Sequence, residues 1–380
     1  MYQVIARKYR PRLFAELVNQ QHVRDTLERA ITEGRVAHSY IFSGQRGVGK
    51  TTVARLLARC LNCTGGPTIT PCGACKSCRE MDMGNAADVI QIDAASNRGI
   101  NEMRELRENV RFQPARDRYR VFIIDEAHQI TSEGFNALLK TLEEPPGWAV
   151  FVLCTTEAHR IPATIASRCQ HFAFRSVGFE DVVGLLERIC RQEGIEADPE
   201  SLAVITQAGD GSVRDSLSAL DQAIARCGAR LDSSEVRSLL GVFSLEDLNQ
   251  VTRALLDSDS RRMLEIVGTL VREGHDLQQF WRGLTRHFRN LLVIKIAGAG
   301  RLIAAPSSEQ ERLRDIADRF SQEDLIRYLD LMLGLGEDLQ WNVSQRAYLE
   351  LGLVKLVQAS KLPLIEAEVT RLNGTGANAT

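Results

Sequence analysis

The sequence has no apolar run long enough to cross a membrane, and its start, Met1 to Val4, lacks the apolar core of a signal peptide. These two absences predict a cytoplasmic protein. A charge excess is absent as well, because 47 lysines and arginines face 49 aspartates and glutamates and leave a net charge of −2. The whole-molecule charge therefore gives no reason to expect nucleic-acid binding, and any surface of that kind would have to be local.

The remaining composition is that of an ordinary globular protein, with 44% apolar and 25% charged residues. At about 150 residues per domain, a chain of 380 residues predicts two or three domains. It contains nine cysteines, which we do not expect to form disulfides in the cytoplasm.

A glycine-rich segment between a short apolar run and a helix-like run organises the chain. It fits the phosphate-loop pattern of a glycine, four residues and then Gly-Lys-Ser/Thr. The glycines let the backbone turn tightly with its N–H groups toward phosphate oxygens, and the helix start adds the positive end of its dipole. We expect Lys50 to contact the outer phosphates and the Thr51 hydroxyl to bind Mg²⁺. The predicted nucleotide-binding residues of this loop are Gly44, Gln45, Arg46, Gly47, Val48, Gly49, Lys50, Thr51 and Thr52.

A second segment, residues 119–126, is an apolar run that ends in two acidic residues. Such a run is typical of a strand buried on both faces of a parallel sheet. Asp125 at its carboxyl end is expected to complete the Mg²⁺ shell, and Glu126 to polarise an attacking water. Together with the phosphate loop, this segment predicts hydrolysis of a nucleoside triphosphate.

The pattern of apolar residues predicts an α/β fold with a doubly wound parallel sheet. Further strands are expected over residues 88–93, 149–154 and 170–174, and helices over 21–32, 100–112 and 132–142. From Val177 onward the pattern predicts helices only, with starts at Asp198-Pro199, Ser212, Ser244, Asp276 and Ser321. The apolar residues between Leu325 and Leu335 cover more than one face, so that helix is central in its domain or buried against another subunit.

Five of the cysteines lie close together in a segment with few apolar residues. Cys72, Cys75 and Cys78, at CxxC spacing, plus one upstream cysteine suit tetrahedral Zn²⁺, and four sulfurs leave no open position, which indicates a structural site. Either Cys60 or Cys63 could be the fourth ligand. We favour Cys63, because Cys60 lies within the predicted helix. The alternative is a set of reduced cysteines without metal.

The basic N-terminal segment, residues 6–12, is either a solvated arm or a contact for the adenine and its phosphates. The second interpretation makes Tyr9, Arg10 and Pro11 nucleotide-binding residues.

These motifs together resemble the gamma/tau subunit family of the bacterial DNA polymerase III clamp loader, within the AAA+ ATPases. The resemblance covers most of residues 5–220 and is carried by seven stretches. They are Ala6-Arg7-Lys8-Tyr9-Arg10-Pro11, Gly44 to Thr51, the cysteine cluster, Asp93-Ala94-Ala95-Ser96, Asp125-Glu126-Ala127-His128, Phe135 to Pro146, and Ser167-Arg168-Cys169.

The resemblance implies roles for residues that the patterns alone leave undefined. Thr155 matches a sensor of the γ-phosphate, Arg214 a second sensor in a helical lid, and Arg168 a finger that reaches the ATP of a neighbouring subunit. Without the resemblance, Arg168 would belong to an ordinary surface turn. The zinc ligands implied are Cys63, Cys72, Cys75 and Cys78.

The resemblance also implies three domains and their partners. An AAA+ domain over 1–177, with a zinc module at about 60–80, is followed by a helical lid over 178–242 and a helical collar over 243–365. A disordered tail is expected over 366–380. The implied partners are the delta and delta-prime subunits, further copies of the chain, the sliding clamp and primer–template DNA. ATP binding and hydrolysis would open the clamp and load it onto DNA as part of the polymerase holoenzyme, with sequence-independent DNA contacts.

Two rival interpretations remain. Asp125 to His128 also match the Asp-Glu-Ala-His box of a helicase, but residues 243–380 lack the second motor domain that a helicase needs. The other rival is a nucleotide-binding scaffold without hydrolysis, like the delta-prime subunit, whose phosphate loop is degraded. Here Lys50, Thr51, Asp125 and Glu126 are all present.

Overall fold

The computed structural model describes residues 3–298, 300, 302–303, 305–341 and 344–359. The predicted tail, 366–380, lies outside the described residues. The chain divides into two compact units, which we treat separately. Unit 1 comprises residues 1–193 and 209–222, and unit 2 comprises residues 194–208 and 223–380. In the described part of the chain, no helix combines the length and apolarity that a membrane span requires.

Unit 1 contains a five-stranded sheet whose strands all run parallel, in the order β2-β3-β4-β1-β5. The strands are β1 (Ser39–Ser43), β2 (Val89–Asp93), β3 (Arg120–Asp125), β4 (Ala149–Thr155) and β5 (Gln170–Ala173). This arrangement confirms the predicted parallel α/β fold. It also aligns the carboxyl ends of the strands, since Ser43 pairs with Thr155 and Asp93 with Asp125. Parallel sheets bind ligands at this edge.

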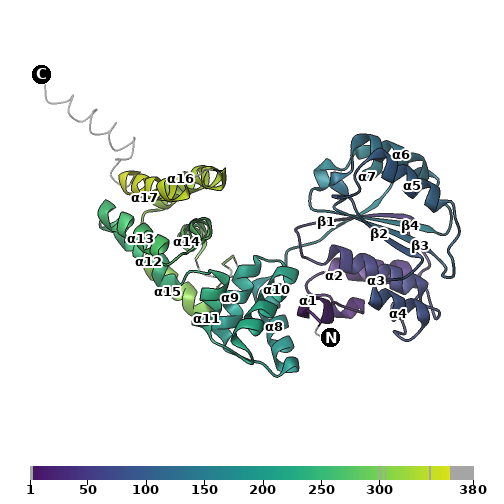
Figure 1. The fold of residues 1–380 in the computed structure, drawn as a ribbon, viewed down its shortest axis with the longest axis horizontal. Helices are drawn as coiled ribbons and strands as arrows, with labels where there is room; N and C mark the ends of the chain where they lie inside the picture. The colour runs from purple at the N-terminus through teal and green to yellow at the C-terminus, as the bar shows by residue number, and fades with distance from the viewer. Residues whose placement is uncertain (1–2, 299, 301, 304, 342–343, 360–380) are drawn as a thin grey trace, which may run out of the picture. The chain divides into compact units, whose positions relative to one another are not determined.

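Helices cover both faces of the sheet, as Figure 1 shows. One face carries α2 (Gln21–Thr32), α3 (Lys50–Asn62) and the short α4 (Lys76–Met83); the other carries α5 (Ile100–Val110), α6 (Ser132–Glu143) and α7 (Ala163–Ala166). In β3, Val121 and Ile123 belong to the hydrophobic core that includes residues of α2 and α3. Phe122 and Ile124 belong to the core that includes residues of α5 and α6. A strand that is buried on both faces must be apolar at every position, which explains the continuous apolar runs.

Short elements complete unit 1. They are α1 (Ile5–Lys8), η1 (Phe14–Glu16), η2 (Ala127–Gln129), η3 (Ala158–Arg160), α8 (Phe179–Glu193) and parts of α9 (Pro199–Gly209) and α10 (Val213–Cys227). The predicted starts of α9 and α10 are confirmed. The Asp198 carboxylate accepts from the Ser201 amide, and the Ser212 hydroxyl accepts from the Asp215 amide.

Unit 2 is helical apart from one small sheet. Its helices are α11 (Ser233–Leu240), α12 (Leu245–Leu256), α13 (Ser260–Arg272), α14 (Leu277–Ala297), α15 (Ser307–Ala317), α16 (Gln322–Trp341) and α17 (Gln345–Ala359). The prediction of helices only after Val177 is wrong at one point, because β6 (Glu196–Ala197) and β7 (Arg230–Leu231) form a parallel pair. Strands of two residues are too short to show an alternating pattern.

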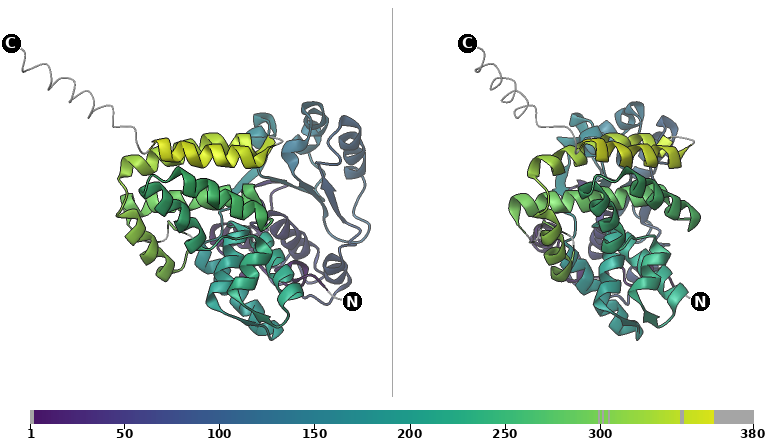
Figure 2. Two further views of the ribbon diagram at one scale, coloured as in Figure 1. Left: turned by 60° about the vertical axis from the view of Figure 1, so that its left-hand side comes forward. Right: turned by 90° about the vertical axis from the view of Figure 1, so that its left-hand side faces the viewer.

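The helix starts predicted for this unit are confirmed by their caps. Ser244 and Asp247 exchange side-chain and backbone hydrogen bonds in a capping box, and Asp276 accepts from two amides of α14. Helix α16 packs centrally on α14 and lies beside α17, as Figure 2 shows. Its buried face is apolar, while Ile326 and Leu333 are exposed.

Candidate nucleotide site and cysteine cluster

The phosphate loop joins the end of β1 to the start of α3. Gly44, Gly47 and Gly49 have φ values of 145°, 77° and 103°, which side chains with a Cβ rarely adopt. The Lys50 ammonium is buried and donates to the carbonyls of Gly44 and Gln45 at 2.7 Å each. Burial lowers the pKa of Lys50. The loop thus has the tight backbone and the buried cation that phosphate binding requires.

The two side chains predicted to bind Mg²⁺ touch each other. The Thr51 hydroxyl donates to Asp125 Oδ1 at 2.7 Å, across from the start of α3 to the end of β3. A hydroxyl and a carboxylate are hard oxygen donors of the kind that Mg²⁺ prefers, usually together with water and substrate phosphates. The donor set therefore fits the predicted metal.

The pocket at this edge of the sheet measures about 720 Å³, and ligand sites typically measure about 300 to 1,000 Å³. Its wall contains the following predicted residues: Tyr9, Arg10, Pro11, Arg46, Gly47, Val48, Gly49, Lys50, Thr51, Thr52, Asp125, Glu126 and Arg214. Among the described residues that line this pocket, four predicted site residues are absent: Gly44, Gln45, Thr155 and Arg168. Gly44 and Gln45 instead contribute the carbonyls that hold Lys50.

The pocket wall has more cations than carboxylates, with Arg7, Arg10, Arg46, Lys50 and Arg214 against Asp93, Asp125 and Glu126. Burial lowers the pKa of Arg10, and the nearby charges of Arg55, Arg214 and Arg7 lower it further. Burial also lowers the pKa of Arg55. Cations that repel one another in a partly buried site are stabilised by an anion, so this electrostatic arrangement suits a polyphosphate.

The basic N-terminal segment lies in the pocket wall rather than extending freely. The amide of Ile5 donates to Asp221 at 3.1 Å, the Lys8 ammonium lies 2.6 Å from Glu193, and the Tyr9 hydroxyl donates to the same carboxylate. These contacts fix the segment against α8 and α10 and place Arg10 in the pocket wall.

The lid segment that carries Arg214 packs directly on the phosphate loop. The Arg214 amide donates to the Gly47 carbonyl at 3.4 Å. A Cβ at position 47 would lie 1.8 Å from the Ser212 hydroxyl oxygen, so only glycine fits here. Arg214, the second residue of α10, thereby lines the pocket.

Glu126 and Thr155 lie at the ends of β3 and β4. Glu126 has a left-handed backbone, with φ 49°, and its carboxylate accepts from the Thr156 hydroxyl at 3.4 Å. Thr155 is fully buried, and its hydroxyl oxygen accepts from the Glu157 amide at 3.0 Å. Arg168 follows α7, is partly exposed, and pairs with Glu143 at 2.5 Å.

Sequence reasoning missed Gln91, which contacts one of the predicted Mg²⁺ ligands, and Arg55, which contacts Gln91. Gln91 on β2 donates to Asp125 Oδ2 at 2.5 Å, and its own oxygen accepts from Arg55 Nε at 3.0 Å. Gln91 is a polar residue within an otherwise apolar strand, which was a usable signal. Its partner could not be read from the sequence, because it depends on how β2 pairs with β3.

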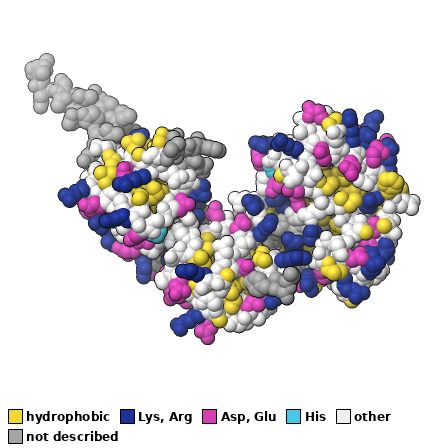
Figure 3. All heavy atoms as spheres, viewed as in Figure 1, with side chains coloured by type: hydrophobic (Ala, Val, Ile, Leu, Met, Phe, Trp, Pro, Cys, Tyr) yellow, Lys and Arg dark blue, Asp and Glu magenta, His cyan; other side chains and the backbone are white. Residues whose placement is uncertain are grey.

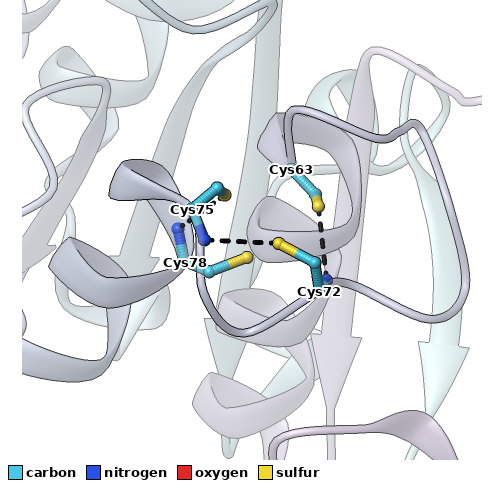
Figure 4. Close-up of side chains that lie close together, drawn as sticks. All are labelled: Cys63, Cys72, Cys75 and Cys78. Carbon is cyan, nitrogen blue, oxygen red and sulfur yellow. Dashed lines mark hydrogen bonds between the residues drawn. The ribbon is translucent and has the colours of Figure 1, made fainter.

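The cysteine cluster lies at the far end of α3, as Figure 4 shows. The ligand atoms of Cys63, Cys72, Cys75 and Cys78 all lie within 4.8 Å of one another. Cys63 ends α3, and Cys75 and Cys78 lie at the start of α4. Cys60 is not in this group, and burial raises its pKa to about 12. Four converging sulfurs fit a tetrahedral Zn²⁺.

Backbone amides donate hydrogen bonds to three of the four sulfurs of this cluster. The amide of Cys72 donates to Cys63 Sγ at 3.4 Å, that of Cys75 to Cys72 Sγ at 3.3 Å, and that of Cys78 to Cys75 Sγ at 3.4 Å. Beside the cluster, the buried Arg59 of α3 pairs with Asp82 of α4 at 2.5 Å. The cluster and this ion pair together join α4 to the phosphate-loop helix.

Charged side chains of both signs are scattered over the visible face of each unit, as Figure 3 shows. This mixture agrees with the small net charge of the chain. Positively charged side chains gather locally, around the pocket.

Three family models match the chain. Residues 19–178 match a family described as DNA polymerase III, delta subunit, and residues 181–229 one described as the DNA polymerase III clamp loader subunit, ATPase lid domain. Residues 231–372 match one described as DNA polymerase III subunits gamma and tau, domain III.

Curated relatives match over nearly the whole chain. The DNA polymerase III subunit tau of Bacillus subtilis is 35% identical over all of this chain and 70% of its own length. The Escherichia coli subunit tau is 37% identical over 97% of this chain and 58% of its own length. The gamma/tau subunit of Mycobacterium tuberculosis is 39% identical over 97% of this chain and 66% of its own length. The chain thus spans between 58% and 70% of the length of these relatives.

Among solved structures, the clamp loader delta protein of Bacillus subtilis matches with 14% identity and a TM-score of 0.39. The match covers 88% of this chain and 99% of that chain. A likeness of this degree supports no conclusion about function.

Proposed function

The chain belongs to the family of the gamma and tau subunits of DNA polymerase III, and on that premise we propose that it is the ATP-hydrolysing subunit of a replicative clamp loader. It would use ATP binding and hydrolysis to open the sliding clamp and to load it onto primed DNA. The observation that carries this proposal is the contact between Thr51 and Asp125 beside a complete phosphate loop.

The residues of the pocket have distinct roles in the proposed reaction. The backbone of residues 44–52 and the Lys50 ammonium hold the phosphates, while Tyr9, Arg10 and Pro11 contact the adenine side. Thr51 and Asp125 would hold Mg²⁺, which when bound neutralises charge on the phosphate oxygens. Glu126 orients the attacking water, and Thr155 and Arg214 contact the γ-phosphate.

Arg168 completes the site of a neighbouring subunit. It does not line the pocket of its own chain and is partly exposed, which agrees with a role in trans. Its guanidinium would neutralise the charge that develops in the transition state, so hydrolysis would depend on assembly.

The remaining regions support the motor domain, residues 1–177. Residues 178–242 form the lid, and residues 243–365 form the collar that assembles with the delta and delta-prime subunits and with further copies of the chain. The four cysteines hold a structural Zn²⁺. Contacts to primer–template DNA are to phosphates, and the protein works in the cytoplasm.

The central experiment measures ATP turnover by the chain reconstituted with its delta and delta-prime subunits, clamp and primed DNA. We expect Lys50→Ala to lower turnover by at least about 100-fold, since it removes the buried cation from the phosphates. Lys76→Ala, which changes a 72% exposed side chain, is the matched control and leaves turnover unchanged. Equal turnover by Lys50→Ala and wild type would show that the chain is a scaffold that binds nucleotide without hydrolysing it.

The role of Arg168 in trans is tested by mixing two inactive variants. Complexes with only Arg168→Ala, or with only Lys50→Ala, are expected to hydrolyse ATP at least about 100-fold more slowly than wild type. When the two variants share one assembly, an intact Arg168 can face an intact Lys50 site, and turnover recovers in part. No recovery in assemblies shown to contain both variants would contradict a finger that acts between subunits.

A further inference from the structure

His128 connects the two strand ends that carry the reaction. It lies on η2, directly after Glu126, and its side chain is only 5% exposed. Its Nδ1 lies 3.1 Å from the Thr155 hydroxyl oxygen and 3.5 Å from a Glu126 carboxylate oxygen. Its Nε2 lies 3.0 Å from the Gln129 side-chain nitrogen and 3.3 Å from a Glu157 carboxylate oxygen.

The Thr155 hydroxyl has one proton to donate, and two groups already compete for its oxygen. The Glu157 amide donates to that oxygen at 3.0 Å. If Nδ1 of His128 has no hydrogen, Thr155 must donate its only proton to the imidazole and has none for a phosphate. If Nδ1 carries a hydrogen, Thr155 accepts from both neighbours and its proton is free to point to a ligand.

The groups around the ring decide between these cases. The Glu126 carboxylate would face a lone pair if Nδ1 had no hydrogen, which is repulsive. The other ring nitrogen, Nε2, has a donor as its nearest partner, because the Gln129 side-chain nitrogen lies 3.0 Å away and the Glu157 carboxylate oxygen lies farther, at 3.3 Å. The tautomer with its hydrogen on Nδ1 lets Nε2 accept from Gln129 while Nδ1 faces Thr155 and Glu126.

We propose that His128 is a positioning residue that donates from Nδ1 to Thr155, so that the Thr155 proton is reserved for the terminal phosphate of the nucleotide. This inference rests on the proposed function, in which Thr155 contacts that phosphate. His128 acts through Thr155 and does not itself touch the nucleotide.

The experiment compares two substitutions of His128 in wild-type and Thr155→Val backgrounds. His128→Asn can keep a donor close to the position of Nδ1, whereas His128→Leu fills the space without one. We expect His128→Leu to lower kcat for ATP about 10-fold and His128→Asn to lower it less than threefold. Affinity for ADP, which lacks the terminal phosphate, stays unchanged in both variants.

The Thr155→Val background shows whether the effect passes through Thr155. His128→Leu is expected to cause no further loss there, because the hydroxyl that His128 orients is already missing. An equal 10-fold loss in both backgrounds, or an equal loss for Asn and Leu, would overturn the proposal.

A measurement without turnover separates this inference from the proposed function. In the full chain with ¹⁵N-labelled histidine, NMR reports which ring nitrogen of His128 carries hydrogen, with His128→Asn used for the assignment. We expect a protonated Nδ1, and an unprotonated Nδ1 refutes the inference even if the chain hydrolyses ATP. If wild type does not hydrolyse ATP but Nδ1 is protonated, the proposed function fails while the hydrogen-bond geometry stands.

Discussion

The two units bury polar groups in opposite ways. In unit 1, Lys50 and Arg10 line one pocket, Arg55 lies near Arg10, and burial lowers the pKa of each. In unit 2, two neutral polar side chains that are buried in the core are paired within the protein. His287 bonds to Thr252 at 3.1 Å, and the Trp281 ring nitrogen donates to the Met332 carbonyl at 3.1 Å.

This contrast separates a binding site from a core. Cations that are buried beside one another make the folded chain less stable, and an anionic ligand removes that cost. Paired neutral groups need no ligand, since their hydrogen bonds are already satisfied. The electrostatics therefore favour the pocket of unit 1 over the core of unit 2 as the site for an anionic ligand. Three experiments sharpen the comparison.

The largest expected effect is at the cysteine cluster, where a metal ion would stabilise unit 1 independently of the nucleotide pocket. We expect Cys63→Ser to abolish zinc binding and to lower the free energy of unfolding by more than about 3 kcal/mol, because the segment around it has few apolar contacts of its own. Mass spectrometry of the native protein and thermal unfolding measure the two effects. Cys60→Ser, one turn earlier on α3, is the matched control and keeps the metal. Wild-type protein that contains no zinc would contradict the prediction.

The next effect is the acid sensitivity of the core of unit 2. Burial lowers the pKa of His287 from 6.5 to about 4. Below pH 6.5, His287 binds a proton in the unfolded chain but not in the folded chain. The free energy of unfolding therefore falls as the pH decreases from 6.5 to about 4. The shift corresponds to a loss of about 3 kcal/mol once the pH is below both values.

His287→Gln is the variant that isolates this effect, since glutamine stays neutral and can still donate to Thr252. Denaturant unfolding at several pH values is expected to show a smaller loss of stability in the variant over this window. Parallel pH dependences for variant and wild type would show that another group carries the acid sensitivity.

The smallest effect concerns the hydrogen bond that fixes Asp125 in unit 1. Gln91→Leu removes the donor to Asp125 Oδ2, while Thr51 still holds Oδ1. We expect turnover to fall about 10-fold, with a higher Mg²⁺ concentration needed for half-maximal rate. Gln91→Glu, which keeps the pairing with Arg55 but repels Asp125, is expected to be at least as impaired. A titration of turnover against Mg²⁺ checks both, and an unchanged midpoint in Gln91→Leu would show that Thr51 alone orients the carboxylate.

Local patterns were sufficient to predict much of unit 1. Four of the five strands, the loop glycines and the cysteine group all depend on residues that are close in sequence or on continuous apolar runs. The helix starts at Ser244 and Asp276 could likewise be predicted from local sequence, because each capping side chain accepts from backbone amides no more than three positions later.

The features that escaped prediction all depend on pairing between distant segments. The bond from Gln91 to Asp125 needs the register of β2 against β3, and the bond from His128 to Thr155 needs the alignment of β3 with β4. The pair of β6 and β7 joins residues more than 30 positions apart in two-residue strands. No local periodicity encodes such contacts, because they form only when the tertiary fold brings the segments together.

Because Gly47 has no side chain, the phosphate loop and the segment before α10 pack in direct contact. Ser212 occupies the space that a Cβ would need, and the Arg214 amide donates to the Gly47 carbonyl. We therefore expect a ligand that changes the conformation of the loop to change the position of Ser212 and of the first turn of α10 as well.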